Sequence, residues 1–216
     1  MSFPWLRTLW PQRDSGPSGA AFDARHGIDA GASVDLDRLT IGSESRRFGE
    51  RYQPSEPGVL IDTVKYIGLD PAQHRFIDLG CGKGRMLIVA AELGFRSCVG
   101  VEFATELAQA ARRNAAAAGF RNISVIHGDA GAYGFAPGRG APKDEPLVLY
   151  LFNPFSAEIM TRVRDNLARL PRANYTIIYK NARERAIFDA LPTLRYLGSP
   201  PRHGGLLGTH VWVPKS

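Results

Sequence analysis

The chain has only two cysteines and no long apolar run among its 216 residues. Two cysteines are too few for a disulfide framework, and we expect them to stay unpaired in a reducing cytoplasm. No stretch approaches the roughly 20 apolar residues that span a bilayer. The N-terminus also lacks a basic head followed by an apolar segment, so it predicts no secretory signal. These absences favour a cytoplasmic domain without a membrane span.

Several catalytic signatures are missing as well. The five histidines are scattered, without the Cys/His spacing typical of zinc sites, so no metal is predicted. The chain has no G-x-S-x-G elbow and no Ser-His-Asp order. A glycine-rich segment contains Lys83, but the P-loop pattern is absent. We therefore expect Lys83 to face solvent.

Net charge is a weaker guide to function. Subtracting the 21 acidic residues from the 27 lysines and arginines leaves +6 at pH 7. That balance favours an acidic partner such as RNA, phosphorylated material or a membrane surface. A basic surface without any partner explains it equally well, since no Lys/Arg run exceeds two residues. The oligomeric state is not indicated.

The first quarter of the chain differs in composition from the rest. Residues 1–20 are rich in Pro, Gly and Ser, which predicts disorder. Residues 22–49 show a mixed pattern that suggests short turns. We interpret 1–49 as a partly disordered extension that covers the core, and 50–216 as the functional domain.

Residues 50–216 alternate between strand-like and helix-like segments. Helical periodicity is seen at 57–68, and later helices are expected at about 85–93, 105–118, 156–169 and 182–190. Apolar runs predict strands at about 75–79, 98–102, 123–127, 147–152, 175–179, 193–198 and 206–213. The last two have no helix between them and should form an antiparallel hairpin. The predicted fold class is therefore α/β: a Rossmann-like, doubly wound, seven-stranded sheet that is mostly parallel.

Residues 76–85, Phe-Ile-Asp-Leu-Gly-Cys-Gly-Lys-Gly-Arg, carry the strongest functional signal. The glycines let the backbone turn sharply and approach a ligand, and a helix N-terminus follows. Glu102, about twenty residues on, is placed to accept the hydroxyls of a ribose. Asp78 stands just before the turn, where an acid suits a cationic amino group better than a phosphate. The pattern indicates a bound nucleoside.

Asp-x-Gly-x-Gly-x-Gly with a following acid resembles motif I of the class I, seven-strand S-adenosylmethionine methyltransferases. The glycine turn of another α/β enzyme is the alternative. The resemblance implies S-adenosylmethionine as cofactor, with its methionine part held by Asp78 and the loop. The loop residues concerned are Gly80, Cys81, Gly82 and Gly84. Glu102 would bind the ribose, and Phe103 would pack against adenine unless it belongs to the core.

The end of the third predicted strand, Asp129-Ala130, also matches the family. There an Asp commonly binds the adenine amino group, and the next backbone N–H meets a ring nitrogen. The resemblance therefore implies that Asp129 and Ala130 contact adenine. An Asx turn after Gly128 is the alternative.

The acceptor side is indicated by Asn153-Pro154-Phe155, which follows the fourth predicted strand. Ligands of open α/β sheets bind beyond the carboxyl ends of strands. The segment resembles the Asn-Pro-Pro-Tyr/Phe motif of amino-directed methyltransferases, with one proline missing. All three residues would position an amine, and Asn153 would also border the cofactor; a tight turn is the alternative. Tyr179-Lys180-Asn181, at the end of the fifth strand, could line the acceptor pocket, but a position at the surface is expected.

Tyr52-Gln-Pro-Ser55 precedes the first helix. Followed by the glycine motif, it resembles the small prokaryotic seven-strand protein-lysine methyltransferases and, more distantly, the non-SET histone-lysine methyltransferases. The match covers about 50–130 and implies that Tyr52 and Ser55 close the site. The expected function is methyl transfer to an amine, with protein lysine as one candidate. Methylation of RNA or DNA, and a non-catalytic binding protein of this fold, are the alternatives.

Overall fold

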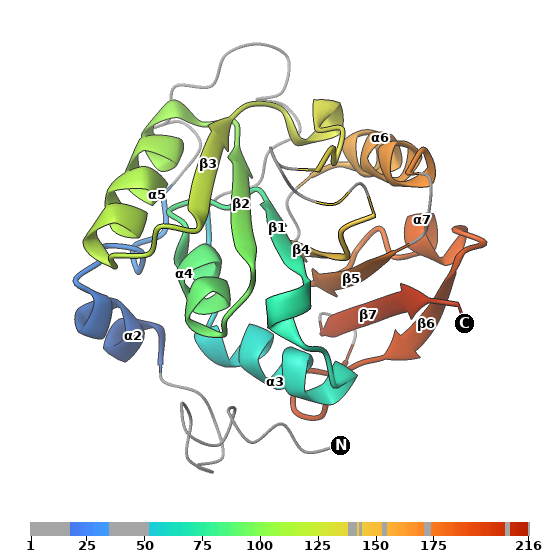
Figure 1. Cartoon of the computed structure of the whole chain (residues 1–216), viewed down its shortest axis with the longest axis horizontal. Coiled ribbons are helices and arrows are strands. Elements are labelled where there is room, and N and C mark those ends of the chain that lie inside the picture. Colours follow the sequence, from blue (N-terminus) through green and yellow to red (C-terminus); the bar gives the residue numbers. More distant parts are fainter. Residues whose placement is uncertain are drawn as a thin grey trace.

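The computed structural model describes residues 18–34, 52–137, 142, 144–152, 155–170, 174–205 and 208–215. Its centre is a seven-stranded sheet of order β3-β2-β1-β4-β5-β7-β6 (Figure 1). The strands are β1 (Arg75–Leu79), β2 (Ser97–Glu102), β3 (Ile123–His127), β4 (Leu147–Phe152), β5 (Tyr175–Lys180), β6 (Leu194–Gly198) and β7 (Thr209–Pro214). The first five run parallel, and β7 pairs antiparallel with β5 and β6. The predicted fold class is confirmed.

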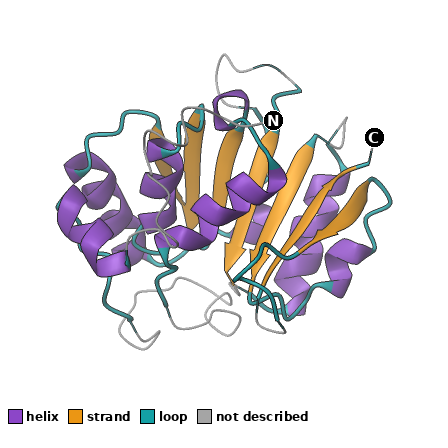
Figure 2. Ribbon diagram, turned by 90° about the horizontal axis from the view of Figure 1, so that it is seen from below, coloured by secondary structure: helices purple, strands orange, loops and turns teal. Residues whose placement is uncertain are grey.

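Helices cover both faces of this sheet (Figure 2). The α-helices are α2 (Gly19–His26), α3 (Pro57–Ile67), α4 (Arg85–Glu92), α5 (Thr105–Ala117), α6 (Ala157–Ala168) and α7 (Ala186–Asp189). Two short 3₁₀ helices, η3 (Pro71–Gln73) and η4 (Ala130–Ala132), lie in connections. Most bounds fall within three residues of the predicted ones, although α7 is much shorter. Among the described residues, every helix is too short or too polar to cross a membrane.

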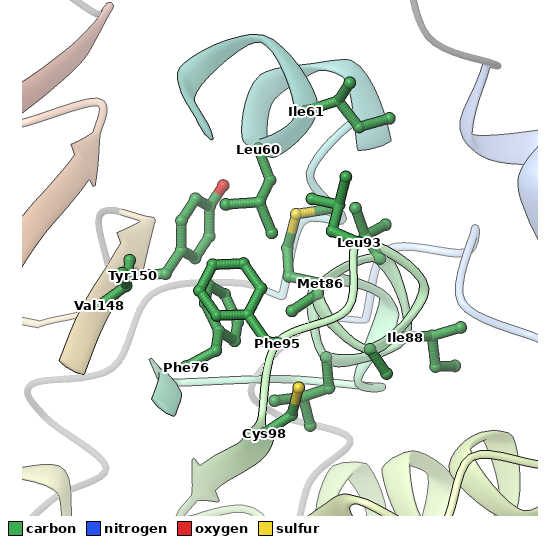
Figure 3. Packing of buried hydrophobic residues seen from close by; sticks show 14 of the residues in the cluster. Leu60, Ile61, Phe76, Met86, Ile88, Leu93, Phe95, Cys98, Val148 and Tyr150 are labelled. Atoms are coloured by element: carbon green, nitrogen blue, oxygen red, sulfur yellow. The ribbon is translucent and has the colours of Figure 1, made fainter. Parts of the chain in front are cut away.

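Two apolar clusters hold the helices on the sheet. Phe76 and Tyr150 face α3 and α4, where Leu60 and Met86 pack around them (Figure 3). Their strand neighbours, such as Ile77, belong to the cluster on the face of α6 and α7. Successive strand residues point to opposite faces, so a strand covered on both sides is apolar throughout. This arrangement explains the unbroken apolar run of β4.

The N-terminal part contains a helix that the sequence did not predict. Helix α2 starts inside the segment expected to be disordered, with the Ser18 hydroxyl accepting a hydrogen bond from the Ala21 N–H at 3.3 Å. Phe22 is fully buried and fixes the helix on the domain. Residues 1–17 and 35–51 lie outside the described residues, so disorder there stays a prediction. We call residues 18–34 the N-terminal cover.

Candidate active site

The loop between β1 and α4 has a backbone that only glycine adopts easily. Gly80, Gly82 and Gly84 have φ values of 78°, 54° and 83°, in the left-handed region. A Cβ added at Gly82 would lie 2.1 Å from Cε2 of Tyr52. The loop therefore needs glycine at position 82 both for its turn and for the ring packed on it.

Asp78 lies at the centre of the site. It is 4% exposed, and among the described residues no group donates a hydrogen bond to its carboxylate. Burial raises the pKa of Asp78 well above its ordinary value, and the nearby Glu102 carboxylate raises it further. A buried carboxylate without a donor is costly, which makes it a strong attractor for a cation.

A small cavity of about 30 Å³ opens beside this carboxylate. Asp78, Gly80, Cys81, Tyr52 and Ser55 are among the residues that line it, so five predicted site residues meet there. Burial also raises the pKa of the Cys81 thiol, which keeps the sulfur protonated. The volume is room for about one water molecule. A larger ligand can enter only if the lining residues move.

Glu102 holds the glycine loop through its side chain. Its Oε2 accepts a hydrogen bond from the Gly82 N–H at 2.9 Å, and its Oε1 accepts one from the Ala104 N–H at 2.9 Å. Burial raises the pKa of Glu102, while these backbone hydrogen bonds partly oppose the rise. Each carboxylate oxygen still has a second lone pair. The expected contact with ribose is thus compatible with the loop contact and stays a prediction.

Tyr52 and Ser55 cover the loop from one side. The Tyr52 hydroxyl donates to the Ala30 carbonyl at 2.8 Å, and its ring lies against Gly82. The Ser55 hydroxyl is 2.8 Å from the Tyr150 hydroxyl. Burial raises the pKa of both phenols. That Tyr52 and Ser55 close the site over a cofactor stays a prediction.

The N-terminal cover is tied to the same loop by charged groups. Arg85, at the start of α4, donates from Nε and Nη2 to the Asp23 carboxylate at 2.8 and 2.6 Å. Lys83 is 8% exposed, with its ammonium 3.4 Å from the Asp29 carboxylate. The prediction that Lys83 faces solvent is therefore wrong. The N-terminal cover lies over Lys83, whereas the side chain of its partner, Asp29, is 84% exposed.

The adenine-side residues lie outside the Asp78 cavity. Asp129 caps η4, with Oδ1 accepting from the Gly131 N–H at 2.8 Å, as the Asx-turn alternative expects. Ala130 is buried in the core. Phe103 is half-buried, and its carbonyl lies 3.0 Å from Nε2 of His127. Contacts of Phe103, Asp129 and Ala130 with adenine stay predictions.

The acceptor motif is described only at its end. Asn153 and Pro154 lie outside the described residues. Phe155 packs against the core cluster on the α6 and α7 face and does not line the Asp78 cavity. Its predicted contact with the acceptor stays a prediction.

Lys180 is less exposed than the sequence predicted. It is half-buried at the end of β5, and its ammonium lies 5.4 Å from the ring centre of Phe152, which lines the Asp78 cavity. Burial lowers the pKa of Lys180. Tyr179 is fully buried, so surface placement of this segment is wrong for Tyr179 and incomplete for Lys180. Tyr179 is buried because it packs against Phe188 of α7, with ring centroids 5.9 Å apart.

These residues fit a cationic nucleoside better than a metal ion. Asp78 matches a cation, and the glycine loop lines the small cavity beside it, where a nucleoside would enter. Within the described ranges, no group of three His, Cys, Asp or Glu side chains is placed to hold a metal ion. Admitting a ligand the size of S-adenosylmethionine requires residues that line this cavity to move.

Comparison with known proteins agrees with this geometry. Residues 71–138 match the model of a family described as a methyltransferase domain. Aklanonic acid methyltransferase DauC from Streptomyces sp. (strain C5) is 35% identical over 105 residues, which are 48% of this chain and 47% of that protein. The chain thus spans about half the length of this curated relative.

Solved structures show the same fold. The ribosomal protein L11 methylase from Lactobacillus delbrueckii subsp. bulgaricus superposes with a TM-score of 0.54 and 18% identity, over 73% of this chain and 79% of that one. A variant of MtNAS in complex with S-adenosylmethionine gives a TM-score of 0.50 and 24% identity, over 72% and 60% of the two chains. The strand order and these similarities establish the Rossmann-like fold of class I methyltransferases.

Proposed function

We propose that this chain, which has the class I methyltransferase fold, is an S-adenosylmethionine-dependent methyltransferase. The observation that carries the proposal is the buried Asp78 carboxylate, which has no described donor and lies where the glycine loop begins. The amino group of the cofactor's methionine part would supply the missing positive partner. The matched methyltransferase domain and the MtNAS complex with the same cofactor support this choice.

The residues of the site divide the remaining tasks. When bound, the cofactor supplies a methyl group activated by a sulfonium cation. Asp78 binds the amino group of its methionine part and so orients it. Glu102 holds the loop and offers its free lone pairs to the ribose hydroxyls. Tyr52 and Ser55 close over the loop and exclude water.

The acceptor proposed is an amine nitrogen, with a protein lysine as the first candidate. Support comes from the sequence motif Asn153-Pro154-Phe155, whose amide and carbonyl oxygens suit an N–H donor, and from the Tyr52–Ser55 segment. The half-buried Lys180 lies at the carboxyl end of the strand next to β4. Burial lowers the pKa of its ammonium group.

Net charge favours a second candidate acceptor, nucleic acid. A charge of +6 attracts a phosphate polymer independently of sequence. Retention of the full chain on immobilised RNA, weakening steeply as salt rises, would support this reading. Retention that is weak at low salt would leave the amine of a protein or small molecule as the better acceptor.

The proposal is tested by incubating labelled S-adenosylmethionine and the chain with fractionated cell extract. We expect label to enter the protein fraction, and Glu102→Ala to weaken binding of adenosylhomocysteine strongly. Asn153→Ala should lower turnover while sparing cofactor affinity. Cofactor binding without label in any fraction would contradict methyl transfer and favour a binding protein. Unchanged affinity of the Glu102 variant would remove the ribose assignment.

A further inference from the structure

A second, larger cavity lies where β5, β6 and the loop before β7 meet. Its volume is about 660 Å³, and its lining includes Arg183, Arg185, Tyr196, Ser199 and His210. Pockets for small molecules commonly measure about 300–1,000 Å³. None of these residues lines the Asp78 cavity. None of the proposed site residues that the structure describes lines this cavity.

The register of the sheet puts the two cavities on opposite faces. Phe152, which lines the Asp78 cavity, is paired with Lys180 of β5. The preceding residue, Tyr179, therefore points to the other face, and it is paired with His210 of β7. Tyr179 accordingly belongs to the core cluster packed under α7. The larger cavity is thus a separate site.

Positive charge dominates the lining of this cavity. Arg183 and Arg185 both contribute, and among the described lining residues none is Asp or Glu. The Arg185 guanidinium lies 4.7 Å from the ring centre of Tyr196, with its Nε 3.5 Å from the Asp189 carboxylate. Two arginines in the lining of one concave site favour an oxyanion as the ligand.

An aromatic platform forms another side of the cavity. The rings of Tyr196 and His210 are stacked, with centroids 5.9 Å apart. The Tyr196 hydroxyl is 2.8 Å from Nδ1 of His210. Burial lowers the pKa of His210, and the Arg185 charge lowers it further, which disfavours the charged imidazole. The arginines are the main source of positive charge in the lining.

The turn that carries the arginines is held in a strained shape. Asn181 has a φ of 53°, which is uncommon for a residue with a side chain, and its N–H donates to the Gly208 carbonyl at 2.8 Å. The Arg183 N–H donates to the Asn181 carbonyl at 2.9 Å. Strain of this kind persists where the surrounding structure enforces it, often at ligand sites. Here it fixes the backbone from which both arginines extend.

We propose that this cavity is a binding site for a small molecule that carries a carboxylate or a phosphate. Arg183 and Arg185 bind the oxyanion, and the Tyr196 ring contacts the body of the ligand. The size and concavity of the site favour a small molecule over a polymer. The site stands independently of methyl transfer.

Calorimetry on the full chain tests the site with two probes, inorganic phosphate and benzoate. We expect at least one probe to bind, and Arg183→Gln to weaken that binding at least about tenfold. Arg195→Gln is the matched control, because Arg195 is exposed on β6 and absent from the cavity lining. Phosphate binding alone indicates a phosphate ester as the ligand, and benzoate binding alone indicates a carboxylate. Adenosylhomocysteine, titrated into the same variants, should bind unchanged.

Three outcomes would overturn the proposal. The first is that neither probe binds to a chain that melts cooperatively. The second is that Arg183→Gln and Arg195→Gln bind the probes as the unaltered chain does. The third is that a single-stranded RNA oligonucleotide binds far more tightly than either probe and loses that affinity in Arg183→Gln, which would assign the arginines to nucleic acid. Loss of adenosylhomocysteine binding in the unaltered chain would refute the proposed function and leave this site untouched.

Discussion

Replacing Asp78 by Asn should stabilise the protein without ligand and weaken its binding of the cofactor. The side chain is 4% exposed, with no described donor and with the Glu102 carboxylate nearby. Burying an unpaired charge costs several kcal/mol, whereas a buried amide costs less. We expect Asp78→Asn to raise the free energy of unfolding by about 1–3 kcal/mol at high pH. At about 2–4 °C per kcal/mol for a chain of this size, the change in Tm is readily measured.

The stabilisation by Asp78→Asn should grow with pH. Burial raises the pKa of Asp78 in the folded protein, so the folded protein holds this proton more tightly than the unfolded chain does. Its free energy of unfolding therefore falls as the pH rises from the ordinary carboxyl pKa toward the raised one. The variant lacks this titration, and its Tm should exceed that of the unaltered chain by more at pH 9 than at pH 5.

Calorimetry should show that Asp78→Asn weakens the binding of adenosylhomocysteine, although the same change stabilises the ligand-free protein. Losing a charge-assisted hydrogen bond of about 1.5–3 kcal/mol weakens binding about 10- to 150-fold. Asp165→Asn, on the exposed side of α6, is the control and should change neither quantity. The reasoning is refuted if Asp78→Asn lowers Tm equally at every pH, or if the variant binds adenosylhomocysteine as well as the unaltered chain.

Two further substitutions test how the glycine loop is held. Gly82→Ala should lower the free energy of unfolding of the ligand-free protein more than Gly94→Ala does, because its Cβ would overlap the Tyr52 ring, whereas Gly94, also at positive φ, has nothing within 4 Å. Equal losses in the two variants would contradict the contact. Asp23→Ala should lower the free energy of unfolding by about 3–5 kcal/mol in urea denaturation, because it leaves the Arg85 guanidinium buried and unpaired. A loss below 1 kcal/mol would mean that the cover is not anchored by this pair.

The sequence predicts the parts of the site that depend on local patterns. The run from Phe76 to Arg85 combines an apolar strand, three glycines and a helix start, and each feature acts over a few residues. The position of Glu102 at the end of the second strand can be predicted because one strand–helix–strand unit has a characteristic length. The parallel sheet follows from the alternation of elements, and the hairpin from the missing helix. These signals are strong because neighbouring residues alone determine them.

Contacts between distant segments could not be predicted. Helix α2 starts at a glycine in a Pro- and Gly-rich region and has a weak apolar face, so it depends on docking of Phe22. The Asp23–Arg85 pair joins residues 62 positions apart. Lys83 is buried only because the N-terminal cover lies over it, and Lys180 only because β7 adds to β5. Tertiary packing decides all of these, and no local pattern encodes it.

The central claim is that a sulfonium nucleoside binds at the carboxyl end of β1 through the Asp78 carboxylate. A crystal of the full chain grown with adenosylhomocysteine tests it most directly. The account predicts the ligand at the glycine loop, its amino group within hydrogen-bond distance of the Asp78 carboxylate, with the Tyr52 ring displaced from its present place over Gly82. Clear density for an empty loop at saturating ligand, or for the ligand bound elsewhere, would contradict it.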